Sequence, residues 1–102
     1  MQQVDSAAEF DQILAANPFV LVDFYADWCG PCRMMTPILA SLETVHTGVK
    51  FIKVNVDSAG ELASRFKVAS LPTFLAFKNG QVIDTILGAD RASVERLLKN
   101  MN

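Results

Sequence analysis

The sequence predicts an α/β fold in which a mixed central sheet of about five strands carries four helices on both faces. Two nearly continuous apolar runs, at residues 19–26 and 49–56, are typical of strands buried on both faces. Amphipathic helical segments alternate with these runs, and strand–helix–strand units imply parallel pairing through right-handed crossovers. Asn79-Gly80 between two β-rich runs, 73–78 and 81–87, indicates a hairpin that adds an antiparallel pair at one edge.

Length and composition fit a single domain spanning residues 1–102. Apolar residues make up 51% of the chain, enough for a core without cross-links. The net charge of −2 favours neither a nucleic-acid nor a membrane surface, and no apolar run approaches the ~18 residues of a membrane span. The N-terminal residues lack the features of a secretory signal, so we expect a cytoplasmic location, unless a signal was removed from a longer precursor.

The first two helices have recognisable boundaries. Residues 6–9 form a Ser-x-x-Glu capping box that opens a helix, and Asn17-Pro18 ends it; a short strand at residues 2–4 precedes it. The second helix is expected to follow the Cys-Gly-Pro-Cys turn and to end at Gly48. Its apolar positions are Met34, Met35, Ile38, Leu39, Leu42 and Val45.

Two further helices follow the second apolar run. A short one is expected after Asp57 or Ser58, with Glu61 completing another capping box. The last begins after Asp90. Its apolar residues recur at helical spacing: Val94, Leu97, Leu98 and Met101.

Both cysteines of the chain lie in Trp28-Cys29-Gly30-Pro31-Cys32. On the first turn of a helix, residues i and i+3 share a face with Cβ atoms about 5–6 Å apart, so a small adjustment allows a disulfide. The closed loop is very short and removes little entropy from the unfolded chain, so a structural disulfide is the weaker explanation. Half of a zinc site is another alternative, but only His46 remains as a strong ligand. We therefore predict a redox-active disulfide and no metal.

The two cysteines are expected to have different roles. Pro31 suits the first helical turn, which places Cys29 at or next to the N-cap. Backbone N–H groups there favour the thiolate, the form that attacks a disulfide. We predict Cys29 as the nucleophile and Cys32, one turn deeper and more covered, as the resolving thiol.

With this dithiol at a strand-to-helix junction, the chain resembles the thioredoxin family along essentially its whole length. The segments that carry the resemblance are residues 22–32, 53–57 (Lys-Val-Asn-Val-Asp), 71–73 (Leu-Pro-Thr) and 77–80 (Phe-Lys-Asn-Gly). Two departures are modest. Tyr25 stands where many members carry a second tryptophan, and Ala69-Ser70-Leu71 differs from the family's common versions, which affects the expected partner preference.

Asp23 matches the buried aspartate of the family. A carboxylate inside an apolar strand is costly to ionise, so we expect a raised pKa and a role in taking and returning the proton of Cys32. An edge position or a solvated bulge is the alternative. The resemblance implies that Lys53 lies near Asp23 and modulates its titration; an ordinary snorkelling lysine is the alternative.

The resemblance also implies a substrate-binding surface around the dithiol. Pro72 matches the family's cis-proline, which exposes the backbone of Leu71 for strand-like pairing with a substrate segment. We expect Trp28 to be a half-exposed cover of the site, with a core position as the alternative. Gly88 matches a groove glycine, or else serves only a turn. The expected substrate-binding residues are Trp28, Gly30, Pro31, Leu71, Pro72 and Gly88.

The function that these expectations give is reduction of protein disulfides, a thiol–disulfide oxidoreductase without a bound cofactor. The expected partners are disulfide-containing client proteins and a recycling reductase, for which the resemblance suggests an NADPH-dependent flavoenzyme, thioredoxin reductase, with a ferredoxin-linked enzyme as the alternative. A disulfide isomerase or oxidant on the same fold is the nearest rival, although Gly30-Pro31 resembles the reducing members. A redox-independent docking subunit is a more distant one.

Overall fold

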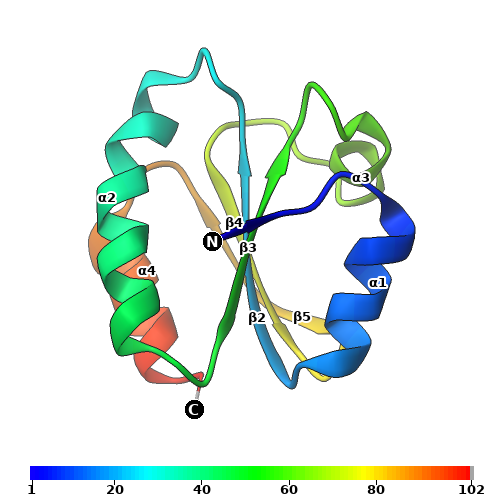
Figure 1. Ribbon diagram of the computed structural model, residues 1–102. Helices are drawn as coiled ribbons and strands as arrows, with labels where there is room; N and C mark the ends of the chain where they lie inside the picture. The colour runs from blue at the N-terminus through cyan, green and yellow to red at the C-terminus, as the bar shows by residue number, and fades with distance from the viewer. Residues whose placement is uncertain (102) are drawn as a thin grey trace.

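A five-stranded mixed sheet with two helices on each face forms the described part of the chain, residues 1–101 of the computed structural model (Figure 1). The elements are β1 (Gln2–Gln3), α1 (Ala7–Ala16), β2 (Phe19–Tyr25), α2 (Gly30–Val45), β3 (Lys50–Asn55), α3 (Gly60–Arg65), β4 (Thr73–Lys78), β5 (Gln81–Leu87) and α4 (Arg91–Lys99). Their order along the chain confirms the predicted fold class.

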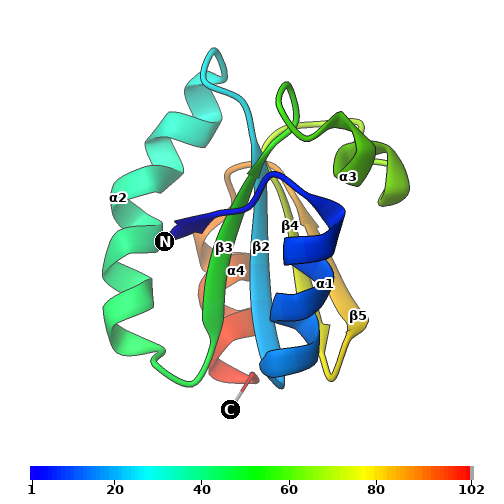
Figure 2. The same cartoon turned by 45° about the vertical axis from the view of Figure 1, so that its right-hand side comes forward.

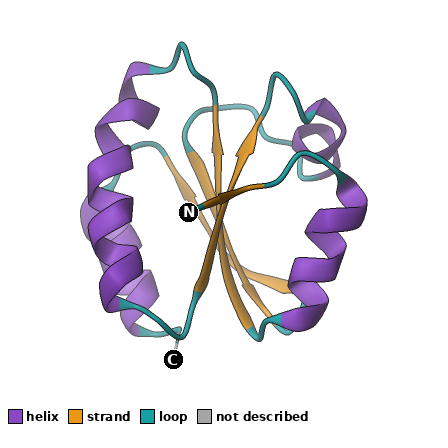
Figure 3. Ribbon diagram, viewed as in Figure 1, coloured by secondary structure: helices purple, strands orange, loops and turns teal. Residues whose placement is uncertain are grey.

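The sheet has the strand order β1-β3-β2-β4-β5. The pairs β1–β3 and β3–β2 are parallel, whereas β4 runs antiparallel to both β2 and β5. Strand β2 is therefore central, as its apolar run predicts. Figure 3 shows the strands as one twisted layer between the two pairs of helices.

Each face of the sheet carries its own apolar layer, because successive strand residues point to opposite faces. Helices α1 and α3 cover one layer, which contains Phe10, Phe24 and Phe77. Helices α2 and α4 cover the other, which contains Phe51 and Phe74. Full burial of each such ring stabilises the fold by about 1.5–3 kcal/mol, so both layers hold the central strand in place.

Three local signals act as predicted. The Ser6 side chain accepts a hydrogen bond from the Glu9 N–H at 3.1 Å and caps α1. Asp90 caps α4 in the same way through the Ser93 N–H at 3.1 Å. Asn79 and Gly80 have φ of 50° and 83°, the positive values that a tight hairpin turn between β4 and β5 requires.

The predicted start of α3 is wrong. The N-cap is Ala59, which makes no side-chain cap, instead of Asp57 or Ser58. Asp57 N–H donates to the Asn55 side chain at 2.9 Å, and Ala59 N–H donates to the Asn55 carbonyl at 2.8 Å. The residues after β3 therefore form a turn around Asn55, and the helix begins only beyond it.

Two predicted core positions of α2 are also wrong. Met34 and Val45 are 68% and 71% exposed. The face of α2 that packs on the sheet is the narrower stripe around Met35 and Leu39. Met34 lies about 100° around the helix from Met35, and Val45 is the last helical residue, because α2 ends at His46 and not at Gly48.

Candidate active site

The disulfide lies at the carboxyl end of the central strand, where β2 leads into α2. The chain between α3 and β4 returns to the same end of the sheet, as Figures 1 and 2 show. A larger depression of about 540 Å³ lies near Pro18 and Gly80, at the opposite end of β2, and contains neither cysteine. The chemistry of the dithiol is thus confined to the first end.

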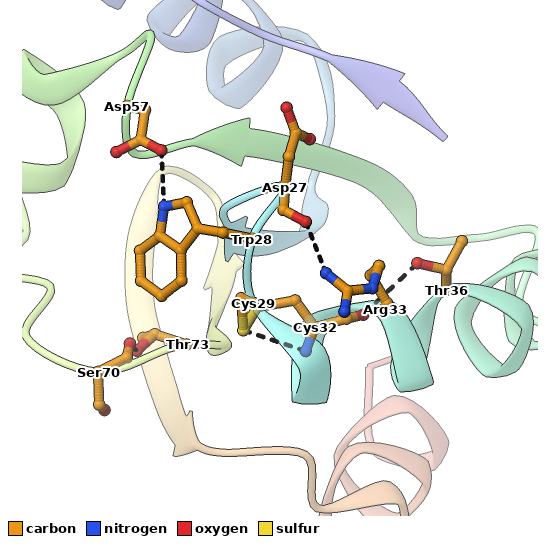
Figure 4. Close-up of a disulfide and its surroundings, with 9 residues drawn as sticks. All are labelled: Asp27, Trp28, Cys29, Cys32, Arg33, Thr36, Asp57, Ser70 and Thr73. Atoms are coloured by element: carbon orange, nitrogen blue, oxygen red, sulfur yellow. Dashed lines mark hydrogen bonds between the residues drawn. A yellow bond between two sulfur atoms is a disulfide. The ribbon is translucent and has the colours of Figure 1, made fainter.

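Cys29 is the N-cap of α2, in agreement with the prediction from Pro31. Its Sγ accepts a hydrogen bond from the Cys32 N–H at 3.2 Å (Figure 4), and the Cα atoms of the disulfide-bonded pair are 5.3 Å apart. A backbone donor aimed at sulfur, together with the positive end of the helix dipole, stabilises a thiolate there in the reduced protein.

Burial does not separate the two cysteines. Cys29 is 5% exposed and Cys32 is 4% exposed, so the expectation that Cys32 is clearly more covered is wrong. The residues around each cysteine do separate them. Cys29 borders a surface depression of about 400 Å³, and Cys32 borders a different one of about 310 Å³.

The first depression, which we call the outer groove, is mainly apolar. It is lined by Trp28, Cys29, Gly30, Pro31, Val56, Val68, Ala69, Ser70 and Leu71. Trp28 is 69% exposed, more than the half-exposed cover that we expected. Its indole N–H donates to Asp57 Oδ2 at 2.9 Å, and in Figure 4 the ring extends from the loop beside Cys29 towards Asp57. This bond fixes the ring without covering it.

The loop before β4 forms the far wall of the outer groove. The Leu71–Pro72 peptide bond is cis, as the family resemblance implied. The Thr73 hydroxyl donates to the Ser70 carbonyl at 2.6 Å, and the Gly88 N–H donates to the Pro72 carbonyl at 2.8 Å. Gly88 has a φ of 86°, which favours glycine. Leu71 thus lines the groove directly, whereas Pro72 and Gly88, which are bonded to each other, do not line it.

The second depression, which we call the inner pocket, contains most of the charged groups near the dithiol. It is lined by Met1, Gln3, Asp23, Tyr25, Ala26, Asp27, Cys32, Arg33, Thr36 and Lys53. The structure therefore brings Asp23 and Lys53 together with Cys32, as the family resemblance implied.

Asp23 lies in the middle of β2 and is only 6% exposed, which excludes an edge or solvated position. Its Oδ1 is buried without a hydrogen-bond partner in the protein. Loss of solvation raises the pKa of this carboxyl to about 7, and the nearby positive charge of Lys53 opposes the rise. A group with this pKa exchanges protons readily at neutral pH.

Lys53 lies directly opposite Asp23 in the pairing of β2 with β3. Its ammonium group, however, lies 5.4 Å from the centre of the Tyr25 ring, and no ion pair joins Lys53 to Asp23. The sequence marked Tyr25 only as a departure from the family pattern, so its contact with Lys53 was missed. Asp57, 29 residues from Trp28, was missed as well, and no local signal predicts that contact.

The described residues, 1–101, contain no group of three or more His, Cys, Asp or Glu side chains arranged to hold a metal ion. Within the same range, no helix is long and apolar enough to cross a membrane.

Known proteins of similar sequence identify the family of this chain. The family model described as thioredoxin matches residues 2–102. Thioredoxin 1 of Plasmodium falciparum is 42% identical over 96 residues, which cover 94% of this chain and 92% of that protein. Thioredoxin of Chlamydia caviae is 42% identical over 99 residues, which cover 96% of each.

Solved structures agree over the whole chain. The structure of Plasmodium falciparum thioredoxin superposes with a TM-score of 0.96 at 39% identity, covering 100% of both chains. That of Fasciola hepatica thioredoxin gives 0.96 at 31% identity, again covering 100% of both. The chain belongs to the thioredoxin family of thiol–disulfide oxidoreductases.

Proposed function

We propose that the protein reduces disulfide bonds of client proteins, with Cys29 as the nucleophile and Cys32 as the resolving thiol. The observation that carries this assignment is the position of the two sulfurs. Cys29 borders the exposed, apolar outer groove, whereas Cys32 borders the inner pocket that holds the buried acid Asp23. A client disulfide docks in the groove, and proton transfer takes place in the pocket.

In the first step, the Cys29 thiolate attacks one sulfur of the client disulfide. A bond forms between Cys29 Sγ and that sulfur, the client S–S bond breaks, and the other client sulfur leaves as a thiolate that takes a proton from solvent. The N–H of Cys32 and the start of α2 stabilise the attacking thiolate.

In the second step, the Cys32 thiol gives its proton to the Asp23 carboxylate, directly or through a water. The new thiolate attacks Cys29 Sγ, the Cys29–client bond breaks, and the second client sulfur leaves with its electron pair. Two electrons have then passed from the dithiol to the client. The pKa of about 7 at Asp23 matches this exchange at neutral pH.

Client binding uses the outer groove. The exposed ring of Trp28 and the surfaces of Gly30, Pro31 and Leu71 supply apolar contact. Leu71, which lines the groove together with Cys29, offers its backbone for strand-like pairing with a client segment, and Gly88 supports the loop through its bond to Pro72.

The oxidised protein needs a separate reductase for each new cycle. We propose an NADPH-dependent flavoenzyme, thioredoxin reductase, as the electron donor, and no cofactor bound to this chain itself. We also propose a cytoplasmic location. Because a relative from Saccharomyces cerevisiae that is named as mitochondrial is 36% identical to this chain, fractionation of the host cell is the direct test.

Mixed-disulfide trapping with two matched variants tests the roles of the cysteines. Cys32→Ser is expected to accumulate stable mixed disulfides with insulin, whereas Cys29→Ser is expected to capture almost none. Both variants should lose insulin reduction with dithiothreitol as the electron source. The reverse trapping pattern would refute the assignment of nucleophile and resolving thiol. Equal trapping by both variants would refute the proposal that the groove and the pocket give the two cysteines different functions.

The reduction potential separates a reductant from an oxidant or isomerase of the same fold. A value near that of protein disulfide isomerase, about −180 mV, would contradict the proposed direction of electron flow.

A further inference from the structure

We propose that Tyr25 is a positioning residue: its ring holds the Lys53 ammonium group away from Asp23, so that the buried carboxyl of Asp23 remains unpaired. The effect on turnover rests on the proposed role of Asp23, but the contact itself does not. Four side chains on one face of the sheet set the geometry of this contact.

These four side chains form two neighbouring pairs on strands β2 and β3. Asp23 lies opposite Lys53, and Tyr25 lies opposite Asn55. Because alternate strand residues share a face, all four lie on the face that α2 covers, in line with Leu21 and Phe51 of that apolar layer. Lys53 therefore has two possible partners: the carboxyl directly opposite and the aromatic ring diagonal to it.

The structure shows which partner Lys53 takes. Its Nζ lies 5.4 Å from the centre of the Tyr25 ring, within the range of about 6 Å for a cation–π contact. Asp23 Oδ1 keeps no hydrogen-bond partner in the protein. A cation–π contact in a partly buried pocket stabilises by about 0.5–2 kcal/mol, which is enough to compete with an ion pair that would have to be desolvated.

The other cation of the pocket is also held elsewhere. Arg33 donates from a guanidinium N–H to the Asp27 backbone carbonyl at 2.8 Å (Figure 4). The charged groups that face the pocket are Asp23, Asp27, Lys53 and Arg33, and the Met1 amino group pairs with Glu43 of α2 at 3.1 Å. With both nearby cations bound to other groups, burial dominates the titration of Asp23.

Titration of the Asp23 carboxyl carbon by NMR, in the oxidised protein without a client, tests the proposal. Tyr25→Leu removes the ring and frees Lys53 to pair with Asp23, so the pKa of Asp23 should fall by about one unit, a tenfold rise in its acid dissociation constant. Tyr25→Phe keeps the ring face and should leave the pKa within a few tenths of the wild-type value.

A double-mutant cycle with Lys53→Met separates this effect from entry of water. In the Lys53→Met background, Tyr25→Leu should leave the pKa of Asp23 unchanged. An equal fall of the Asp23 pKa in both backgrounds would mean that the ring acts by excluding solvent, and this would overturn the proposal. The absence of any fall when Tyr25→Leu is made alone, with Lys53 retained, would overturn it as well.

A second measurement needs no substitution. The ε-methylene protons of Lys53 should show an upfield ring-current shift that Tyr25→Leu abolishes; its absence in the wild-type protein would also overturn the contact. Neither readout depends on Cys29 or Cys32 acting as proposed, so a failed trapping experiment and a failed titration are distinguishable. If both the contact and the role of Asp23 hold, Tyr25→Leu moves the pH midpoint of the second step by the same amount as the titration, and Tyr25→Phe restores it.

Discussion

The outer groove and the inner pocket meet at one disulfide and differ in nearly everything else. The groove is mainly apolar, and its most exposed member, Trp28, is 69% accessible. The pocket holds two carboxyl side chains and two cationic side chains, and its central acid, Asp23, is 6% accessible. Cys29 and Cys32 themselves are equally buried. The different roles proposed for these two chemically identical side chains thus rest on their neighbours and not on their depth.

The physical reasons for reactivity also differ on the two sides. On the groove side, a backbone N–H and the start of α2 favour the charged form of sulfur. On the pocket side, burial raises the pKa of Asp23 to about 7. The carboxyl therefore takes and gives a proton near neutral pH. Substitutions on each side should therefore change different measurements.

The largest expected effect is on stability, from the pocket side. Moving a carboxyl pKa from 3.8 to about 7 corresponds to about 4 kcal/mol of destabilisation when the group must be ionised in the folded state. Asp23→Asn should therefore raise the free energy of unfolding by about 2–4 kcal/mol at pH 8 and by little at pH 4.

The sign follows from the two pKa values. Asp23 ionises at a lower pH in the unfolded chain than in the folded protein, so wild-type stability falls as pH rises from about 4 to 7. Urea unfolding of the oxidised wild type and variant at both pH values measures the difference. An equal gain at pH 4 and pH 8 would assign the effect to packing instead of ionisation.

The next effect is on the rate of the second step. Loss of a general base costs about 100-fold or more, so Asp23→Asn should slow release of the client from the Cys29 mixed disulfide by roughly that factor, with the first attack unchanged. Rapid mixing with a disulfide client resolves the two steps. Asp27→Asn, a second carboxyl on the same pocket but exposed, is the matched control and should change the rate less than twofold.

A smaller effect is expected from the groove side. Trp28→Ala removes an exposed aromatic contact, and such contacts are worth 1 kcal/mol or more at interfaces. The KM for a protein client should rise about fivefold, while a small disulfide that does not fill the groove should react normally. Asp57→Ala, which removes only the bond to the indole N–H, should raise KM less. A changed pH midpoint in Trp28→Ala would show that groove and pocket are coupled.

The smallest effect is expected just outside both regions. Met34 is exposed on the same helix as Cys32 but lines neither the groove nor the pocket. Met34→Gln should change KM and both rates less than twofold. A rise in KM for Met34→Gln like that of Trp28→Ala would extend the groove onto α2.

The neighbouring Met35 is buried and gives the contrast on the same helix. Met35→Gln should destabilise the fold by about 2 kcal/mol or more.

Signals that act over a few residues were read correctly from the sequence. The capping of α1 by Ser6, the Asn79-Gly80 turn and the N-cap position of Cys29 each depend on hydrogen bonds or φ values within four residues. The predicted start of α3 was wrong because Asn55, at the end of β3, accepts hydrogen bonds from the Asp57 and Ala59 N–H groups, and the turn that they form places the helix start further along the chain.

The sequence by itself determined the order of the elements, the spacing of the dithiol and the presence of an acid inside an apolar strand, because helical and strand periodicities and turn preferences are local. Only the tertiary structure decided which sulfur borders which depression, that Trp28 bonds to Asp57, and that Lys53 rests on Tyr25 and leaves Asp23 unpaired. Those outcomes depend on desolvation and on contacts between segments far apart along the chain, and both exist only once the sheet and its helices have packed.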